Sequence, residues 1–211
     1  MTLLLVAHGT RDPAGATVTA ALASAVRHRL PDVHVSVAYA DVRAPDVTTA
    51  LASLPFRAVP VVVPAFLAAG YHVRVDIPEQ IRRSGRAAVL TPPLGPSLAG
   101  AAYERLVEAG WRRGEPVALA AAGSTDPRAR ADVARAATRL GALTGGPVRI
   151  GYATGRPRIG DVAPGCAVAS WFLAPGLFHR LAAASGGRVV AEPLGAHPLV
   201  ADLIARRYRA E

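Results

Sequence analysis

The sequence repeats itself, and this duplication constrains the fold more than any other feature. Three segments of the first half return in the same order in the second half: LVAHGTRDP at 5–13 as LAAAGSTDP at 119–127, FLAAG at 66–70 as FLAPG at 172–176, and PLG at 93–95 as PLG at 193–195. Three ordered echoes indicate an internal duplication. We therefore expect two tandem, pseudo-symmetric lobes, an N-terminal lobe at 1–112 and a diverged C-terminal copy at 115–211, with the boundary near residues 110–115.

Apolar runs of strand length alternate with segments of helical period in the first half. Strands are expected at 3–7, 33–39, 59–63 and 87–90, and helices at 14–30, 45–54, 73–84 and 96–111. Continuous apolar strands between helices are typical of a parallel sheet that is covered on both faces. The predicted class is therefore α/β, with one such sheet in each lobe. A hydrophobic content of 51% over 211 residues is enough for two buried cores.

Side chains able to bind a metal follow the first three predicted strands. His8 ends the first strand, Asp41 follows the second, and His72 lies in the loop after the third. Because the carboxyl ends of parallel strands meet at one edge of a sheet, these three side chains are expected on the same rim. Two imidazoles and a carboxylate form an open site for a borderline divalent cation.

Each of these residues also has a purely structural interpretation. His8, between a strand and a glycine, equally suits a helix cap or a bond to a backbone carbonyl, and His72 suits a partly buried structural position. Asp41 equally suits the cap of the helix that follows it. The pairing of the two histidines favours the metal site. In the second half Ala122 and Phe178 replace His8 and His72, so the site is expected in the first half only.

Arginine carries the whole net charge of +9, since the chain contains no lysine. The planar guanidinium suits bidentate pairing with carboxylate or phosphate. Arg11 and Arg74 stand beside the two histidines and are the candidates for binding ligand carboxylates. The other arginines are scattered and aromatic residues make up only 5% of the chain. We therefore expect a small polyanionic ligand and no nucleic acid.

No apolar run approaches the roughly 20 residues that a membrane span requires, and the apolar N-terminus meets His8 too early for a signal peptide. The expectation is a cytoplasmic protein without membrane contact. The single cysteine, Cys166, lies in an apolar run, which favours burial. Because duplication already supplies pseudo-symmetry, a monomer or a small homo-oligomer is expected.

The sequence resembles the sirohydrochlorin chelatases, the class II family that inserts ferrous iron or cobalt into a tetrapyrrole on the way to siroheme or cobalamin. The resemblance is carried by VAHGTRDP at 6–13, VVVPAFLAAGYHV at 61–73, DIP at 76–78 and the two PLG tripeptides. It implies two chelatase-like lobes around a cleft, with His8 and His72 as the catalytic, metal-handling pair. The divalent metal is then a substrate and no cofactor is tightly bound, while the partner is a tetrapyrrole polycarboxylate. Where the family commonly has glutamate, this chain has Asp41.

Two other functions compete with this interpretation. Histidine phosphatases open with a strand that ends in Arg-His-Gly, but Ala7 stands where the arginine is required, and the duplication stays unexplained. A tetrapyrrole or metal carrier would use the same residues without turnover.

Overall fold

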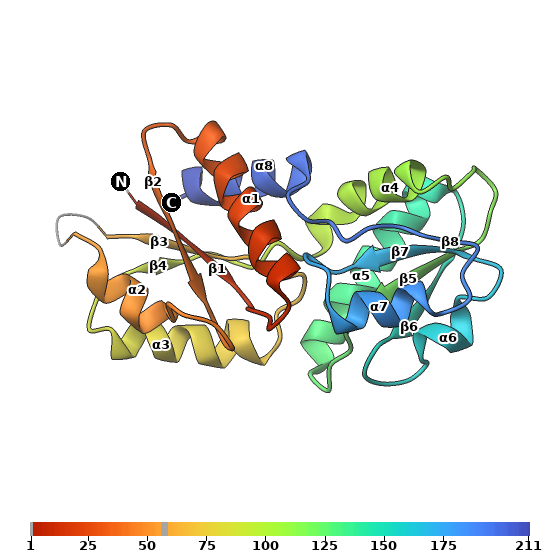
Figure 1. Ribbon diagram of the computed structural model, residues 1–211, viewed down its shortest axis with the longest axis horizontal. Coiled ribbons are helices and arrows are strands. Elements are labelled where there is room, and N and C mark those ends of the chain that lie inside the picture. Colours follow the sequence, from red (N-terminus) through yellow and green to blue (C-terminus); the bar gives the residue numbers. More distant parts are fainter. Residues whose placement is uncertain (1, 56–58) are drawn as a thin grey trace. The chain divides into compact units, whose positions relative to one another are not determined.

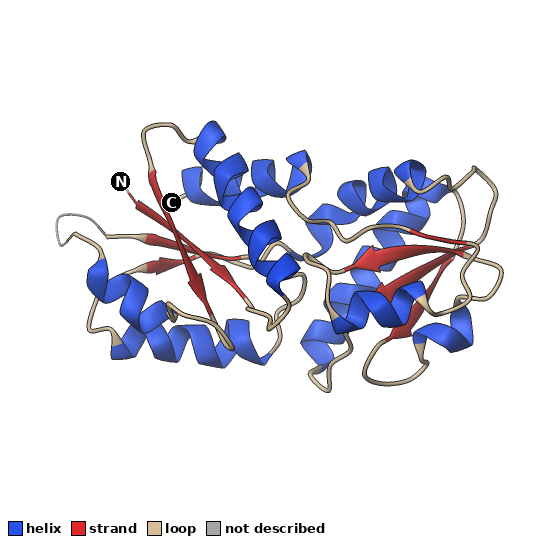
Figure 2. Cartoon of the chain, in the orientation of Figure 1, coloured by secondary structure: helices blue, strands red, loops and turns tan. Residues whose placement is uncertain are grey.

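The computed structural model describes residues 2–55 and 59–211, which form two compact α/β units (Figures 1 and 2). Unit 1 consists of Met1–Leu94 together with Ala196–Glu211, and unit 2 of Gly95–Gly195. Each unit contains one four-stranded sheet in which all neighbouring strands pair in parallel. The predicted α/β class and the predicted parallel sheets are confirmed.

The sheet of unit 1 has the order β2-β1-β3-β4. Its strands are β1 (Thr2–Ala7), β2 (His34–Tyr39), β3 (Val61–Pro64) and β4 (Val89–Leu90). Its helices are α1 (Pro13–Arg29), α2 (Val47–Ser53), the π-helical turn η1 (His72–Asp76), α3 (Ile77–Arg83) and α8 (Pro198–Arg209). Helices α2 and α3 lie on one face of the sheet and α1 and α8 on the other (Figure 1). Leu4 and Val6 point into the α2 and α3 layer, as alternation along a strand requires.

The sheet of unit 2 has the equivalent order β6-β5-β7-β8. Its strands are β5 (Val117–Ala121), β6 (Val148–Tyr152), β7 (Ala167–Trp171) and β8 (Val189–Val190). Its helices are the 3₁₀ turn η2 (Gly95–Leu98), α4 (Ala99–Glu108), α5 (Pro127–Thr144), α6 (Ile159–Val162) and α7 (Leu177–Ala183). The central strands β5 and β7 are buried along their whole length, which explains their continuous apolar sequences.

The contiguous lobes predicted at 1–112 and 115–211 do not coincide with the compact units. Helix α4 belongs to unit 2, where it packs against α5 and β7, and α8 belongs to unit 1, where it packs against α1 and β3. Each half of the sequence therefore gives its last helix to the other unit. The predicted boundary near 110–115 is corrected by this exchange, because a repeat shows which segments are equivalent but not which sheet covers a helix.

The chain passes from one unit to the other at the two PLG tripeptides. Gly95 and Gly195 stand at these passages with φ values of 50° and 58°, a backbone region that favours glycine. One arginine of each exchanged helix donates to a carbonyl of the adjoining tripeptide, Arg207 to Pro93 and Arg105 to Leu194, both at 3.3 Å. The echoed tripeptides thus mark the helix exchange.

Every helix within residues 2–55 and 59–211 is too short or too polar to cross a membrane.

Candidate metal-binding site

His8 leaves the carboxyl end of β1 through a turn that only glycine fits. Gly9 has φ 92°, and a Cβ atom there would lie 2.1 Å from the carbonyl oxygen of Asp41. The backbone N–H of Asp41 donates to the carbonyl of His8 at 3.0 Å, which ties the ends of β1 and β2 together. The side chain of His8 is exposed, and its Nδ1 lies 2.9 Å from the carbonyl oxygen of Gly9.

His72 opens the π-helical turn η1, which follows β3 and leads into α3. Its side chain is 29% exposed, and Nδ1 lies 2.9 Å from Oδ2 of Asp76 one turn later. The sequence predicted one continuous helix over 73–84. The structure instead has a π-helical turn followed by α3, and π-helical turns are frequent at functional sites.

The two histidines meet at the edge of the sheet, as predicted. Their ring centroids are 4.6 Å apart and the rings are inclined by 83°. Phe66 lies beside both, with its centroid 6.0 Å from that of His8 and 6.2 Å from that of His72. Two imidazoles from the segments that follow separate strands therefore converge next to an aromatic ring.

The hydrogen-bond partners assign the tautomers of both rings. The Nδ1 atoms of His8 and His72 face a carbonyl and a carboxylate, which accept but do not donate. Burial works to raise the pKa of Asp76, but hydrogen bonds from Gln80 and His72 outweigh it, and the pKa of this carboxyl lies below its ordinary value. Asp76 is therefore ionised at neutral pH and both Nδ1 atoms carry hydrogen, so that in the neutral form of each ring the lone pair is on Nε2.

Asp41 lies next to His8 along the backbone, but its carboxylate has a different contact. The side chain is exposed, and Oδ1 accepts from the N–H of Val42 at 2.7 Å. Among the residues that the structure describes, no group of three or more His, Cys, Asp or Glu side chains is close enough to hold a metal. Asp41 does not cap α2 either, since Asp46 does so by accepting from Thr49 at 2.7 Å.

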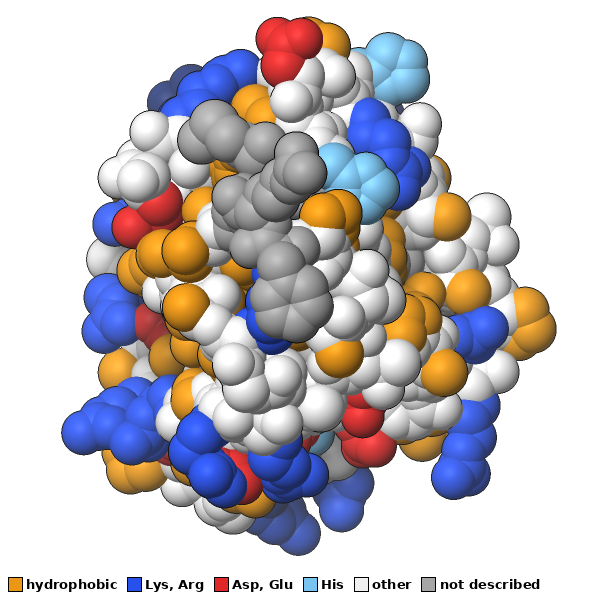
Figure 3. Space-filling view, turned by 90° about the vertical axis from the view of Figure 1, so that its left-hand side faces the viewer, with side chains coloured by type: hydrophobic (Ala, Val, Ile, Leu, Met, Phe, Trp, Pro, Cys, Tyr) orange, Lys and Arg blue, Asp and Glu red, His pale blue; other side chains and the backbone are white. Residues whose placement is uncertain are grey.

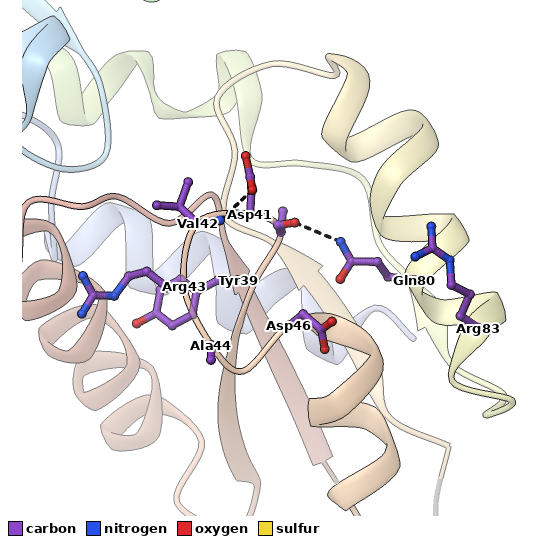
Figure 4. Close-up of a pocket in the computed structure, with 9 residues that line it drawn as sticks. Tyr39, Asp41, Val42, Arg43, Ala44, Asp46, Gln80 and Arg83 are labelled. Atoms are coloured by element: carbon purple, nitrogen blue, oxygen red, sulfur yellow. Dashed lines mark hydrogen bonds between the residues drawn. The ribbon is translucent and has the colours of Figure 1, made fainter.

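A hollow of about 540 Å³ lies beside Asp41 (Figure 4). It is lined by the end of β2, the loop before α2 and two residues of α3: Tyr39, Ala40, Asp41, Val42, Arg43, Ala44, Asp46, Gln80 and Arg83. Gln80 reaches from α3 across its wall to the carbonyl of Ala40, at 2.9 Å (Figure 4). The guanidinium of Arg43 lies 6.0 Å from the ring centroid of Tyr39 and donates to the carbonyl of Thr10.

The two predicted ligand-binding arginines, Arg11 and Arg74, are both exposed. Arg11 follows His8 by three positions, and Arg74 follows His72 by two, within η1. Elsewhere basic side chains are spread among apolar and acidic ones, and on the face shown in Figure 3 they do not merge into one basic surface.

Unit 2 retains the geometry of this site without its ligands. Ala122 and Phe178 occupy the equivalent positions and pack against the apolar core of unit 2. The rings of Phe172 and Phe178 are 6.4 Å apart and inclined by 41°, close to the 6.2 Å and 37° between Phe66 and His72. The equivalent face of unit 2 is therefore apolar where that of unit 1 carries two imidazoles.

Sequence analysis missed Asp76 and Gln80 as functional candidates. Asp76 follows His72 by four positions, and Gln80 follows Asp76 by four, so helical spacing was a usable signal for both contacts.

Two sequence comparisons identify relatives. The CbiX family model matches residues 2–109. A protein of Methanococcoides burtonii named sirohydrochlorin cobaltochelatase is 32% identical over 82 residues, which are 38% of this chain. The match spans 63% of that relative's length.

Solved structures with the same fold match nearly the whole chain. SirB from Bacillus subtilis with Fe³⁺ has a TM-score of 0.82 at 21% identity, covering 99% of this chain and 94% of that one. SirB from Bacillus subtilis subspecies spizizenii in complex with cobalt has a TM-score of 0.80 at 21% identity, with coverages of 99% and 93%. CbiX of denitrifying bacteria, described as the terminal enzyme for biosynthesis of siroheme, has a TM-score of 0.79 at 24% identity, covering 100% and 99%. At these identities the likeness establishes the fold.

Proposed function

Since the chain belongs to the CbiX family, we propose that it is a sirohydrochlorin chelatase, which inserts ferrous iron or cobalt into the tetrapyrrole. The observation that carries this proposal is the His8–His72 pair, in which each Nδ1 is engaged by an oxygen, so that Nε2 of each neutral ring is the nitrogen left for a metal. The name of the Methanococcoides relative and the metals bound to the two SirB structures support it.

The metal is a substrate in this reaction, and the site suits a substrate ion. Two imidazoles bind borderline ions such as Fe²⁺ and Co²⁺ and leave several coordination positions open for water or pyrrole nitrogen. Asp41 is a third candidate ligand, through a bridging water, because its backbone bond to His8 keeps it at the same edge of the sheet. A site with few protein ligands can release its ion to the macrocycle.

The macrocycle would be held by charge at its rim and by apolar contact with its faces. Arg11 and Arg74, which are exposed and stand near the two histidines in the sequence, would pair with its carboxylates. Tyr71 and Val75, which flank His72, are 66% and 47% exposed and offer apolar surface to a flat ring. The matching positions of unit 2 are also exposed and apolar, since they hold Leu177 and Leu181.

Insertion exchanges two pyrrole N–H protons for one divalent ion. An imidazole that gives up the ion regains a free Nε2 lone pair, which can accept one of those protons, while the other proton passes to water. His8 is the better placed of the two for this transfer, because its ring is exposed and can pass the proton to water.

The experiment is anaerobic insertion, followed through the visible spectrum of sirohydrochlorin with Co²⁺ or Fe²⁺ against a protein-free control. We expect multiple-turnover acceleration by the wild type and its loss in His8→Ala and in His72→Ala. The control is His28→Ala, because His28 is exposed at the end of α1 and its Nδ1 bonds only the carbonyl of Ser24 one turn earlier. Binding of the macrocycle without acceleration would favour the carrier function instead.

A further inference from the structure

A chain of hydrogen bonds runs from His72 into the interior of unit 1. Asp76 uses its two carboxylate oxygens separately: Oδ2 lies 2.9 Å from Nδ1 of His72, and Oδ1 accepts from Nε2 of Gln80 at 2.9 Å. Gln80 is 6% exposed, so its amide has to find its partners within the protein. Its Oε1 accepts from the N–H of Val47 and its Nε2 also donates to the carbonyl of Ala40, both at 2.9 Å.

These contacts fix the direction of every bond in the chain. The backbone N–H of Val47 can only donate and the carbonyl of Ala40 can only accept, so the Gln80 amide has a single orientation. Its Nε2 must then point at Asp76, where it requires an acceptor. The carboxylate is left with its other oxygen as an acceptor for His72, whose hydrogen is thereby held on Nδ1 and whose lone pair is held on Nε2.

Unit 2 lacks this chain of hydrogen bonds where it lacks the histidine. When 66–70 is aligned with 172–176, the positions of His72, Asp76 and Gln80 are taken by Phe178, Ala182 and Gly186. Ala182 is fully buried in the apolar core of unit 2. If these hydrogen bonds served only to join α3 to the segment after β2, they would be equally useful in both units. They occur in unit 1, where the histidine is, which connects them with the histidine.

We propose that Asp76 and Gln80 are positioning residues for the metal: the buried Gln80 amide orients the Asp76 carboxylate, which holds the His72 ring in the tautomer that presents Nε2. The inference rests on the proposed function only in taking His72 as a ligand of the substrate ion. Neither residue need touch the ion or the macrocycle.

Asp76→Asn tests the orienting effect of Gln80. The Nε2 donor of Gln80 forces the oxygen of the new amide toward itself, so the new NH₂ group faces His72 and requires an acceptor at Nδ1. The hydrogen of His72 moves to Nε2, where it blocks the metal. We expect the dissociation constant for Co²⁺ alone, followed by its visible absorption, to rise about 10-fold to 100-fold, as is usual when a ligand's hydrogen-bond partner is lost.

The double variant Asp76→Asn with Gln80→Glu reverses the polarity of the pair and keeps its net charge. The carboxylate at position 80 loses the bond to the carbonyl of Ala40 but accepts from the new amide, which turns the amide oxygen back to His72 and restores hydrogen on Nδ1. We expect the double variant to bind Co²⁺ about 10-fold more tightly than Asp76→Asn alone. A purely structural role predicts the opposite, because two losses of packing and bonding would add. A double variant that is folded and no tighter than the single one overturns the proposal.

The wild type provides a test that does not depend on the folding of any variant. In ¹⁵N spectra of the metal-free protein, His72 should be the Nδ1–H tautomer. In Gln80→Met the Asp76 carboxylate is no longer oriented toward His72, so part of the population should lose the His72–Asp76 bond and His72 should become a mixture of tautomers. Thr48→Val is the matched control, since it removes only the bond from the Thr48 hydroxyl to the backbone carbonyl of Gln80, and it should leave both tautomer and Co²⁺ affinity unchanged. A wild-type His72 with hydrogen on Nε2 overturns the proposal. The readouts contain no tetrapyrrole, so Co²⁺ binding with the expected tautomer but without insertion would contradict the chelatase function alone.

Discussion

The ring of His72 stands nearly perpendicular to that of His8, with the two centroids 4.6 Å apart. The rings come from the segments that follow different strands, β1 for His8 and β3 for His72, and each has its Nδ1 atom bound to an oxygen. Two positions separated by more than sixty residues thus bring their rings together. This convergence favours the metal interpretation over two unrelated structural histidines.

Replacing either histidine should weaken metal binding strongly without unfolding the protein. His8→Ala and His72→Ala each remove one of two imidazole ligands. We therefore expect Co²⁺ affinity to fall by more than about 100-fold, which exceeds the usual effect of losing a hydrogen-bond partner of a ligand. The midpoint of urea unfolding should change little for His8→Ala, because that side chain is exposed. A Co²⁺ titration by calorimetry measures the loss, with His28→Ala as the control. Affinity retained in His72→Ala would exclude the pair as the metal site.

The fold could be predicted from the sequence as far as local patterns determine it. The continuous apolar runs predicted the parallel sheets, and the repeated segments predicted the two equivalent units. The exchange of α4 and α8 could not be predicted in this way, because the apolar face of a helix shows that it is buried and not which sheet buries it. Leu106 of α4 and Ile204 of α8 are both fully buried, and the apolar face to which each belongs would look the same in the sequence if the helix packed in the other unit.

The candidate site was predictable where topology alone places a residue. His8 and His72 follow adjacent parallel strands, so their meeting at one edge was expected and is observed. The direction of an exposed carboxylate depends on its nearest N–H groups, which is why the role of Asp41 as a ligand stays a prediction. Gln80 is a polar residue on a helix, and such residues are usually exposed. Its burial and its hydrogen-bond partners therefore became known only from the structure.

Gly9→Ala should damage both the fold and the metal site, whereas Gly123→Ala should damage the fold alone. The two glycines have φ values of 92° and 96°, and a Cβ atom at either would lie 2.1 Å from a backbone oxygen, that of Asp41 or of Thr154. We expect each variant to lose roughly 2 kcal/mol or more of unfolding free energy in urea. Only Gly9→Ala displaces His8, so only that variant should lose Co²⁺ affinity. Equal losses of affinity in the two variants would mean that the turn after β1 does not position the metal ligand.

The helix exchange predicts which sheet each exchanged helix protects. Leu106 of α4 and Ile204 of α8 are both fully buried, so substitution by alanine should cost about 2–5 kcal/mol in each case. Hydrogen exchange followed by mass spectrometry should show that Ile204→Ala speeds exchange in β1 and β3, and that Leu106→Ala speeds exchange in β5 and β7. If Ile204→Ala instead affected β5 and β7, and Leu106→Ala affected β1 and β3, the helices would not be exchanged and the contiguous lobes 1–112 and 115–211 would be correct.

Asp46 should make stability depend on acid pH through the N-terminus of α2. Hydrogen bonds from the side chain and the backbone N–H of Thr49, with the charge of Arg83, hold the pKa of this exposed carboxyl below its ordinary value, against a smaller effect of desolvation. A lowered folded-state pKa means that ionised Asp46 stabilises the fold at pH values above its unfolded-state pKa of about 3.9. This contribution is lost as the pH falls toward the folded-state pKa.

Asp46→Asn keeps a capping acceptor without the charge. Asp46→Ala removes both and should cost about 1 kcal/mol of unfolding free energy at pH 7. In urea unfolding at a series of pH values, the advantage of the wild type over Asp46→Asn should be constant near neutrality and shrink below about pH 4. An advantage that stays constant down to pH 2.5 would show that the charge of Asp46 does not stabilise α2.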